Sequence, residues 1–178
     1  MNIVYLHGFG SKFDPNSTKI LQLSELGDVD GFEIDYTLGE ELVIEQSVAQ
    51  IMNKDVDLLV GTSMGGWLAA KLSNILSIPF TAFNPVILPS DTLQKYIGEH
   101  TDFCGKEYFL DDHTVNQFTK ISDSGYGLVF LDEGDELIDS SVSKKTLEQY
   151  YRVISYTGGC HRFEHIPESI SIIEKFLN

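Results

Sequence analysis

The sequence predicts an α/β fold in which a mostly parallel sheet of about six strands is covered by helices on both faces, with a small cap insertion. Short runs rich in β-branched and aromatic residues alternate along the chain with segments whose apolar residues repeat at helical spacing. Several of these short runs are apolar at nearly every position, which is typical of strands buried on both faces. Because right-handed crossovers between parallel strands bring helices onto the sheet, the alternation favours three layers.

The order of the elements follows from the same patterns. The expected strands are residues 2–6, 31–36, 56–61, 79–84, 127–131 and 152–159, with 31–36 at an edge because apolar and polar residues alternate there. The expected helices are residues 19–26, 38–54, 65–77, 91–97, 141–151 and 166–178. Residues 98–125 show no dominant period, so we expect them to form a cap or insertion within a single domain that spans residues 1–178.

The charge balance limits the possible partners. The 178 residues include 12 Lys and Arg against 27 Asp and Glu, which gives a formal net charge of −15. This charge repels phosphate backbones and anionic membrane surfaces, so nucleic acid is not an expected partner. Asparagine and proline residues interrupt the least charged stretch, residues 74–90, which argues against a membrane span. Two cysteines without metal-ligand spacing, and a start without a secretory pattern, favour the cytoplasm.

One serine stands in a glycine-rich turn that suits a nucleophile. The stretch "GTSMGG", residues 61–66, directly follows the apolar run "VDLLV" and directly precedes the helical pattern "GWLAAKLSN". On a sharp strand-to-helix turn, Gly61 and Gly65 would avoid side-chain clashes while Ser63 takes strained backbone dihedrals and projects outward. The helix N-terminus behind the serine would favour developing negative charge. The alternative is a loop serine that merely caps the helix.

A serine hydroxyl needs a base, and a histidine with an ordinary pKa near 6.5 suits that role at neutral pH. His161 follows the last expected strand in the glycine-led loop "GGCHRF". His165 lies four residues further on and is the competing candidate, although it could be a surface histidine at the start of the final helix. His100 and His113 fall in the expected cap, where we expect exposed polar side chains.

A carboxylate must hold that histidine in the correct tautomer. The stretch "LDEGDELID" offers Asp132, Glu133, Asp135, Glu136 and Asp139, and spacing alone does not choose among them. The strand before it is expected to end near Leu131, and Gly134 permits a turn that aims the next side chain inward. We therefore favour Asp135 and expect the other carboxylates to be solvated.

The oxyanion of an acyl-transfer intermediate needs preorganised N–H donors. The backbone N–H groups of Met64, after the serine, and of Phe9, in the loop "HGFGS" after the first strand, fit this need. We expect His7 to shape this loop through hydrogen bonds and to take no part in proton transfer.

Five ordered motifs carry a family resemblance over nearly the whole chain. They are "YLHGFGS", "GTSMGGW", "FNP", "GDELID" and "GGCHRF". In these motifs the chain resembles the small bacterial YqiA-type esterases of the α/β-hydrolase superfamily. The resemblance implies a compact α/β-hydrolase fold, activity on short or acyl esters and thioesters, and roles for Ser63 as nucleophile, Asp135 as acid and His161 as base. The match is poorest between residues 99 and 124, so the substrate's identity does not carry over.

The expected function is that of a serine esterase or thioesterase that cleaves a small-molecule ester through an acyl-enzyme, without metal or other cofactor. The alternative is a hydrolase-like binding or interaction module with little turnover. Aromatic residues of the cap region could line an acyl pocket or simply pack the insertion onto the sheet. They are Tyr96, Phe103, Tyr108, Phe109 and Phe118.

Overall fold

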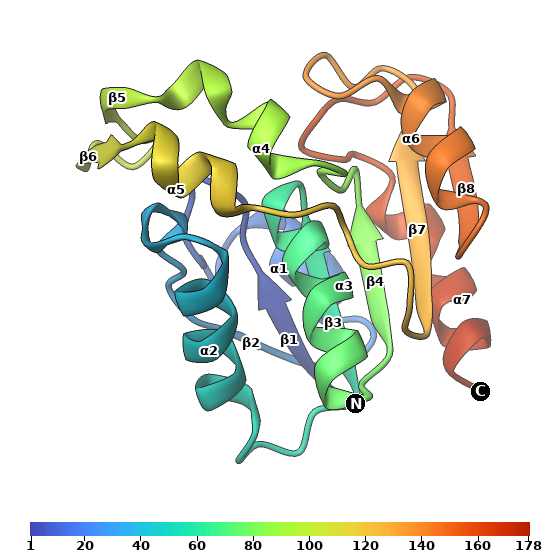
Figure 1. The fold of residues 1–178 in the computed structure, drawn as a ribbon. Helices are drawn as coiled ribbons and strands as arrows, with labels where there is room; N and C mark the ends of the chain where they lie inside the picture. Colours follow the sequence, from blue (N-terminus) through green and yellow to red (C-terminus); the bar gives the residue numbers. More distant parts are fainter.

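A six-stranded, wholly parallel sheet forms the centre of the protein in a computed structural model that describes residues 1–178 (Figure 1). The strand order across the sheet is β2-β1-β3-β4-β7-β8. The strands are β1 (Asn2–Leu6), β2 (Asp28–Gly31), β3 (Leu58–Thr62), β4 (Phe80–Phe83), β7 (Gly127–Asp132) and β8 (Arg152–Tyr156). The predicted fold class is confirmed.

Helices cover both faces of this sheet, and in Figure 1 α3 lies in front of the sheet and α1 behind it. The helices that cover the sheet are α1 (Thr18–Leu23), α2 (Glu40–Ile51), α3 (Met64–Leu76), α6 (Ser140–Leu147) and α7 (Ile166–Leu177). The expected helix over residues 91–97 is only a short α4 (Pro89–Thr92) followed by a 3-10 turn, Gln94–Tyr96. No helix combines the length and the apolar character that crossing a bilayer requires.

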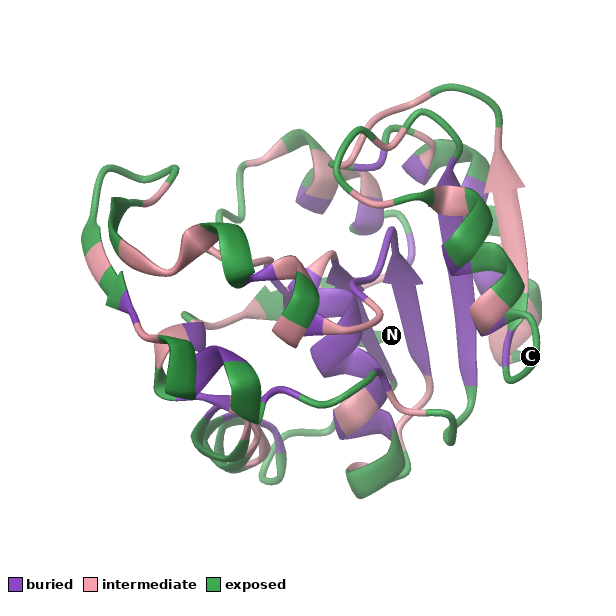
Figure 2. Ribbon diagram, turned by 45° about the horizontal axis from the view of Figure 1, so that its top comes forward, coloured by how far each residue is buried: buried purple, intermediate pink, exposed green.

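The sheet divides the apolar interior into two cores, because successive side chains of each strand point to opposite faces. Val4 and Leu6 of β1 belong to a cluster of 24 buried residues under α2, α3 and α6. Ile3 and Tyr5 belong to a cluster of 14 buried residues under α1 and α7. Successive side chains of a strand point to opposite faces, so a strand that is apolar throughout serves both cores. Figure 2 shows the central strands buried along their length.

The first edge strand lies earlier in the chain than the sequence predicts. The expected strand over residues 31–36 is wrong in its bounds, because β2 ends at Gly31, although its edge position is correct. Parallel pairing of Asn2 with Asp28 and of Tyr5 with Gly31 sets where β2 ends. Beyond Gly31 the chain leaves the sheet and contacts the loop after β1. There the Ile34 N–H donates to His7 Nε2 at 2.9 Å.

Residues 98–125 contribute no strand to the large sheet. They contain an antiparallel hairpin of β5 (Gly98–Thr101) and β6 (Glu107–Leu110), followed by α5 (Asp112–Gln117). The hairpin contacts the loop after β1, since the Phe103 N–H donates to the Gly10 carbonyl at 3.1 Å. This places the hairpin beside the carboxyl end of β1, on the side of β2.

The turn from β3 into α3 requires an unusually close approach of backbone segments. A Cβ on Gly61 would lie 2.0 Å from the Gly65 carbonyl oxygen, and a Cβ on Gly65 would lie 1.9 Å from the Leu6 carbonyl oxygen. Neither clash can be relieved by rotating a side chain, because both involve backbone atoms. The two glycines therefore let the first turn of α3 lie against β1 and β3.

Helix α1 is anchored to the same end of the sheet by a lysine. The Lys19 ammonium donates to Thr62 Oγ1 at 3.0 Å and to the carbonyl oxygen of Arg162. Thr62 is the last residue of β3, and Arg162 follows β8. Desolvation lowers the pKa of Lys19 from 10.5 to about 7, the charge of Arg162 adds to this effect, and charge interactions with Cys160 and Asp132 oppose it.

Replacing Gly65 with alanine should destabilise the protein by about 3 kcal/mol, because the new methyl group overlaps the Leu6 carbonyl. Urea unfolding of Gly65→Ala beside wild type measures this loss. Gly8→Ala is the control, since a Cβ there would come no closer than 3.4 Å to any atom. Equal losses in the two variants would contradict the proposed role of the close approach.

Lys19→Met should reveal a pH dependence of stability. Between pH about 7 and about 10.5 the unfolded chain keeps a proton that the native Lys19 amine has lost. The native state is therefore favoured increasingly as pH rises through this window, and the penalty for a buried charge is greatest below it. We expect the unfolding free energy of wild type minus that of Lys19→Met to rise between pH 7 and 10. A flat or falling difference in urea titrations would show that Lys19 is charged throughout this range.

Candidate active site

Ser63 occupies the sharp turn between β3 and α3, with φ 58° and ψ −122°. Residues other than glycine rarely adopt this conformation, so the backbone is strained at this point. The turn is held by the Ser63 carbonyl, which accepts from the N–H groups of Gly66, Trp67 and Val86. Although Ser63 precedes the helix, its side chain makes no capping hydrogen bond to it. The alternative of a helix-capping serine therefore does not describe this residue.

The structure brings Ser63, His161 and Asp135 together in one hydrogen-bonded row. His161 Nε2 lies 2.9 Å from Ser63 Oγ, and His161 Nδ1 lies 3.0 and 2.9 Å from the two carboxylate oxygens of Asp135. The side chains of His161 and Asp135 are 14% and 2% exposed. If Nδ1 carries the ring proton and donates a hydrogen bond to the carboxylate, Nε2 is free to accept a hydrogen bond from the Ser63 hydroxyl. Such a row can remove a proton from the serine during attack on an electrophile.

Asp135 is fixed by its own loop. Its Oδ1 accepts the N–H groups of Leu137 and Ile138 at 2.8 and 2.9 Å. Gly134 matters for a different reason from the predicted turn: its φ is not positive, but a Cβ there would lie 2.5 Å from the Gly159 carbonyl oxygen. The Gly134 N–H donates to the Gly158 carbonyl at 2.8 Å. The loops that carry Asp135 and His161 are thus pressed together, backbone to backbone.

The expectation that the other carboxylates are solvated is wrong for Asp132, which is fully buried at the end of β7. Its Oδ2 accepts the N–H groups of Cys160 and Glu164 at 3.3 and 2.8 Å. Its Oδ1 lies 2.7 Å from His165 Nδ1. Asp132 is the last residue of a strand buried at every position, and this placement was the sequence signal for its burial.

The other histidines do not contact Ser63. The His165 ring binds Asp132 and stacks on Tyr156, with ring centroids 4.8 Å apart. His100 and His113 are exposed, as the sequence predicts. Of the two candidates near the end of the chain, only His161 lies within hydrogen-bond distance of the serine.

Asn84 is a buried site residue that sequence reasoning missed. Its Nδ2 donates to the carbonyls of Cys160 and His161 at 2.9 and 3.2 Å, and its Oδ1 accepts the Asp132 N–H at 2.8 Å. Its φ of 43° is in the left-handed region, which asparagine tolerates better than most residues. The motif "FNP" contains this residue and was the available signal.

The loop after β1 places Phe9 and Gly8 beside the serine. The Phe9 N–H has no hydrogen-bond acceptor within the protein, and the Met64 N–H, at the first position of α3, has none within the helix. A Cβ on Gly8 would lie 3.4 Å from Ser63 Cβ, so this backbone passes close to the serine. Both N–H groups thus lack an acceptor in the structure, and the Phe9 N–H belongs to the segment that passes close to Ser63.

His7 shapes this loop, as the sequence predicts. It is buried, its Nδ1 lies 2.9 Å from the Gly8 carbonyl, and its Nε2 accepts the Ile34 N–H. These bonds require a proton on Nδ1 and none on Nε2. Desolvation lowers the pKa of His7, which favours this neutral form. The Tyr36 hydroxyl donates to the His7 carbonyl at 2.7 Å and further stabilises the loop.

The aromatic residues expected in the cap region divide into two groups. The rings of Tyr96 and Tyr108 both pack on Phe9, each with centroids 5.3 Å away. Phe118 is buried and packs on Trp67. Phe103 and Phe109 are 75% and 63% exposed. The first pair packs on Phe9 of the loop beside Ser63, and the exposed Phe103 ring lies against Gly10 of the same loop.

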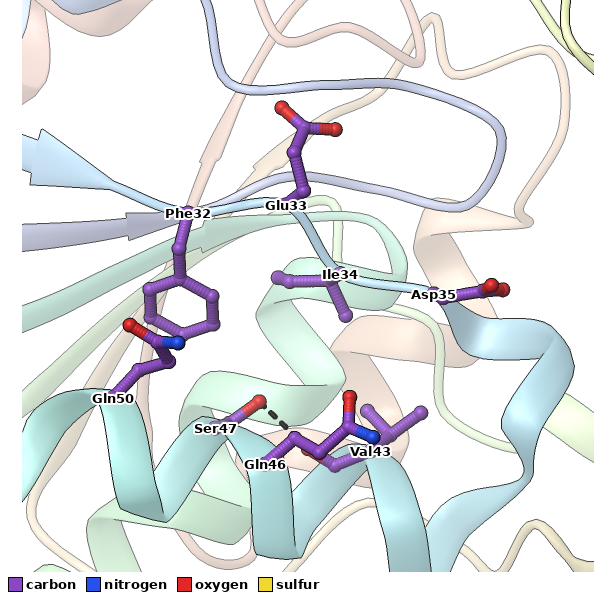
Figure 3. A pocket seen from close by; sticks show the side chains of 8 residues that line it. All are labelled: Phe32, Glu33, Ile34, Asp35, Val43, Gln46, Ser47 and Gln50. Atoms are coloured by element: carbon purple, nitrogen blue, oxygen red, sulfur yellow. Dashed lines mark hydrogen bonds between the residues drawn. The ribbon is translucent and has the colours of Figure 1, made fainter.

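A small cavity lies away from the serine, between residues 32–35 and α2 (Figure 3). Its volume is about 50 Å³, and polar side chains such as Glu33 and Gln46 line it with Phe32. Ser63, Asp135 and His161 do not line it, so it is separate from the candidate active site. No three His, Cys, Asp or Glu side chains come together in a way that could hold a metal ion.

Comparison with solved structures identifies the fold. The protein is similar to Est1E from Butyrivibrio proteoclasticus with bound ferulic acid, with a TM-score of 0.71, 16% identity and coverage of 99% of this chain and 87% of that chain. It is also similar to the monoacylglycerol lipase of Paleococcus ferrophilus, with a TM-score of 0.69, 14% identity and coverage of 99% and 93%. At these identities the likeness shows the α/β-hydrolase fold.

Comparison with other sequences identifies the family. A UPF0227 protein of Vibrio parahaemolyticus is 28% identical over 186 residues, which cover 99% of this chain and 99% of that protein. Residues 2–178 match the model of the family described as Uncharacterised protein family (UPF0227). The expected relationship to the YqiA-type proteins is confirmed, and the chain belongs to the UPF0227 family.

Proposed function

We propose that this protein is a serine hydrolase that cleaves carboxylic esters or thioesters through an acyl-enzyme. The observation that supports the proposal most directly is that the His161 ring lies within hydrogen-bond distance of both Ser63 Oγ and Asp135. A binding module has no need for a serine in a strained conformation aimed at a histidine.

In the proposed acylation step, Ser63 Oγ attacks the carbonyl carbon while its proton passes to His161 Nε2. The carbonyl π electrons move to oxygen and form a tetrahedral oxyanion. When the intermediate collapses, the bond to the leaving oxygen or sulfur breaks, and His161 returns its proton to that atom. Water then attacks the acyl carbon while its proton passes to His161 Nε2. When this second intermediate collapses, the bond to Ser63 Oγ breaks, His161 returns the proton to Oγ, and the acid is released. Asp135 orients the imidazole and stabilises its protonated form.

The oxyanion would accept hydrogen bonds from the Phe9 and Met64 N–H groups. Neither group has a hydrogen-bond partner in the structure, so neither donor must give up a bond to bind the oxyanion. The positive end of the α3 dipole adds to this stabilisation. The chemistry proposed here needs no metal or other cofactor.

For the substrate, we propose a small ester or thioester whose acyl group lies along Phe9, Tyr96 and Tyr108. These rings pack together where the hairpin meets the loop beside Ser63. Residues 98–125 would then form a cap within a single domain of residues 1–178. We further propose a cytoplasmic protein with no nucleic-acid partner, in line with its acidic charge and free cysteines.

Ser63→Ala should abolish hydrolysis of p-nitrophenyl esters and labelling by a hydrolase-directed phosphonate, because both need an activated hydroxyl.

Asp135→Asn should lower kcat roughly 10⁴-fold, because the amide favours the wrong tautomer of His161. Glu133→Gln is the matched control, since Glu133 is an exposed carboxylate in the same loop. Its kcat should equal that of wild type. Equal activity in wild type and Ser63→Ala, or no labelling of either, would favour the binding-module alternative.

Substrates that carry phosphate groups should react poorly. The net charge is −15, and Glu136 accepts the His161 N–H, which holds the pKa of Glu136 below its usual value and keeps it ionised beside the site. For one acyl group, kcat/KM on the N-acetylcysteamine thioester should exceed that on the CoA thioester by about tenfold or more at low salt. Added salt should reduce the difference between the two kcat/KM values, because it screens the repulsion between the protein and the phosphate groups. A preference for the CoA thioester at low salt would instead indicate a cationic binding site.

A further inference from the structure

The segment that carries His161 has little regular structure of its own. Residues 160–165 lie between β8 and α7 and follow Gly158 and Gly159, both with positive φ. Without helical or strand hydrogen bonds, contacts with neighbouring elements must fix the segment's position. The position of His161 relative to Ser63 therefore depends on those contacts.

Three of these contacts meet at one buried carboxylate. Asp132 accepts from the Cys160 N–H, immediately before His161, and from the Glu164 N–H, three residues after it. A Cβ on Gly159 would lie 1.9 Å from Asp132 Oδ2, so the chain passes directly over the carboxylate. Because Asp132 is the last residue of β7, it transmits the position of a central strand to both sides of His161.

His165 provides the third donor to this carboxylate. Its Nδ1 lies 2.7 Å from Asp132 Oδ1, and Nδ1 carries a proton in the protonated ring and in one neutral tautomer. The ring stacks on Tyr156 of β8 with an interplanar angle of 13°. Since a buried carboxylate is costly when its oxygens lack donors, His165 satisfies an oxygen of Asp132 that the backbone N–H groups leave without a partner.

We propose that Asp132 and His165 are positioning residues for His161. They act as a second aspartate–histidine pair that fixes the 160–165 segment where His161 lies within hydrogen-bond distance of Ser63. The inference rests on the proposed function. It extends that function because neither residue touches the serine or would touch the substrate. Asn84 supports the same arrangement, since it donates to the Cys160 and His161 carbonyls and accepts the Asp132 N–H.

Two substitutions of His165 separate its hydrogen bond from its stacking. His165→Phe keeps an aromatic ring against Tyr156 and removes the donor, whereas His165→Asn keeps an N–H near the place of Nδ1 and removes the ring. With p-nitrophenyl esters, His165→Phe should lower kcat about 10²-fold at nearly constant KM, because small displacements of a catalytic group have effects of this size. His165→Asn should retain kcat within about threefold. Glu168→Gln, exposed in the first turn of α7, should match wild type.

Wild-type kcat in His165→Phe would overturn the inference, and so would equal losses in the Phe and Asn variants, because the ring rather than the donor would then matter. If His165→Phe does not fold, Asp132→Asn takes its place. That variant replaces one carboxylate oxygen with an NH₂ group that faces the donors of Cys160, Glu164 or His165, so it should likewise lower kcat at constant KM. An unchanged kcat would refute the proposal.

Failure of the proposed function is recognised separately, by equal activity in wild type and Ser63→Ala. In that case the downfield proton NMR resonance of His161 Nδ1–H reports the hydrogen bond between His161 and Asp135 without any need for turnover. It should weaken in His165→Phe, or in Asp132→Asn where that variant replaces it, and persist in His165→Asn. An equal signal in the tested variant and in wild type would overturn the positioning role.

Discussion

The close approach of α3 to β1 and β3 is the constraint on which the candidate site depends. Gly61 and Gly65 allow backbone atoms to meet where a single methyl group would not fit. At this contact the chain takes the strained conformation of Ser63, directly after the carboxyl end of β3. The contact also brings Ser63 close to the loop after β1, where a Cβ on Gly8 would lie 3.4 Å from Ser63 Cβ.

A second constraint comes from buried polar groups at the carboxyl ends of β3, β4 and β7. Thr62, Asn84 and Asp132 each end or follow a central strand, and each bonds to another segment. Burial of such groups is costly unless their hydrogen bonds are satisfied, so the loops must adopt the one arrangement that satisfies them. Lys19 and His165 complete the set from α1 and from the start of α7. The precise position of His161 follows from this shared network.

Sequence patterns predicted the central elements well and the peripheral ones less well. Strands such as β3 are apolar at nearly every position, and this pattern has no other stable placement than the middle of a covered sheet. The edge strand was displaced because hydrogen bonding to β1, rather than local alternation, determines where β2 ends. The hairpin of residues 98–110 escaped prediction because its short strands are mostly exposed, so they carry no apolar period.

By itself, the sequence determined the parallel α/β architecture, the strand-to-helix turn at Ser63 and the choice of residues 158–163 as a functional loop, because periodicity and glycine spacing are local properties. Position along the chain favoured Asp135 and His161, but only the tertiary structure shows which acid faces which histidine. Asp132 and Asp135 are three residues apart, and His161 and His165 are four apart, so local chemistry does not distinguish the pairs. The close packing of two loops does, since it directs Asp135 to His161 and Asp132 to His165.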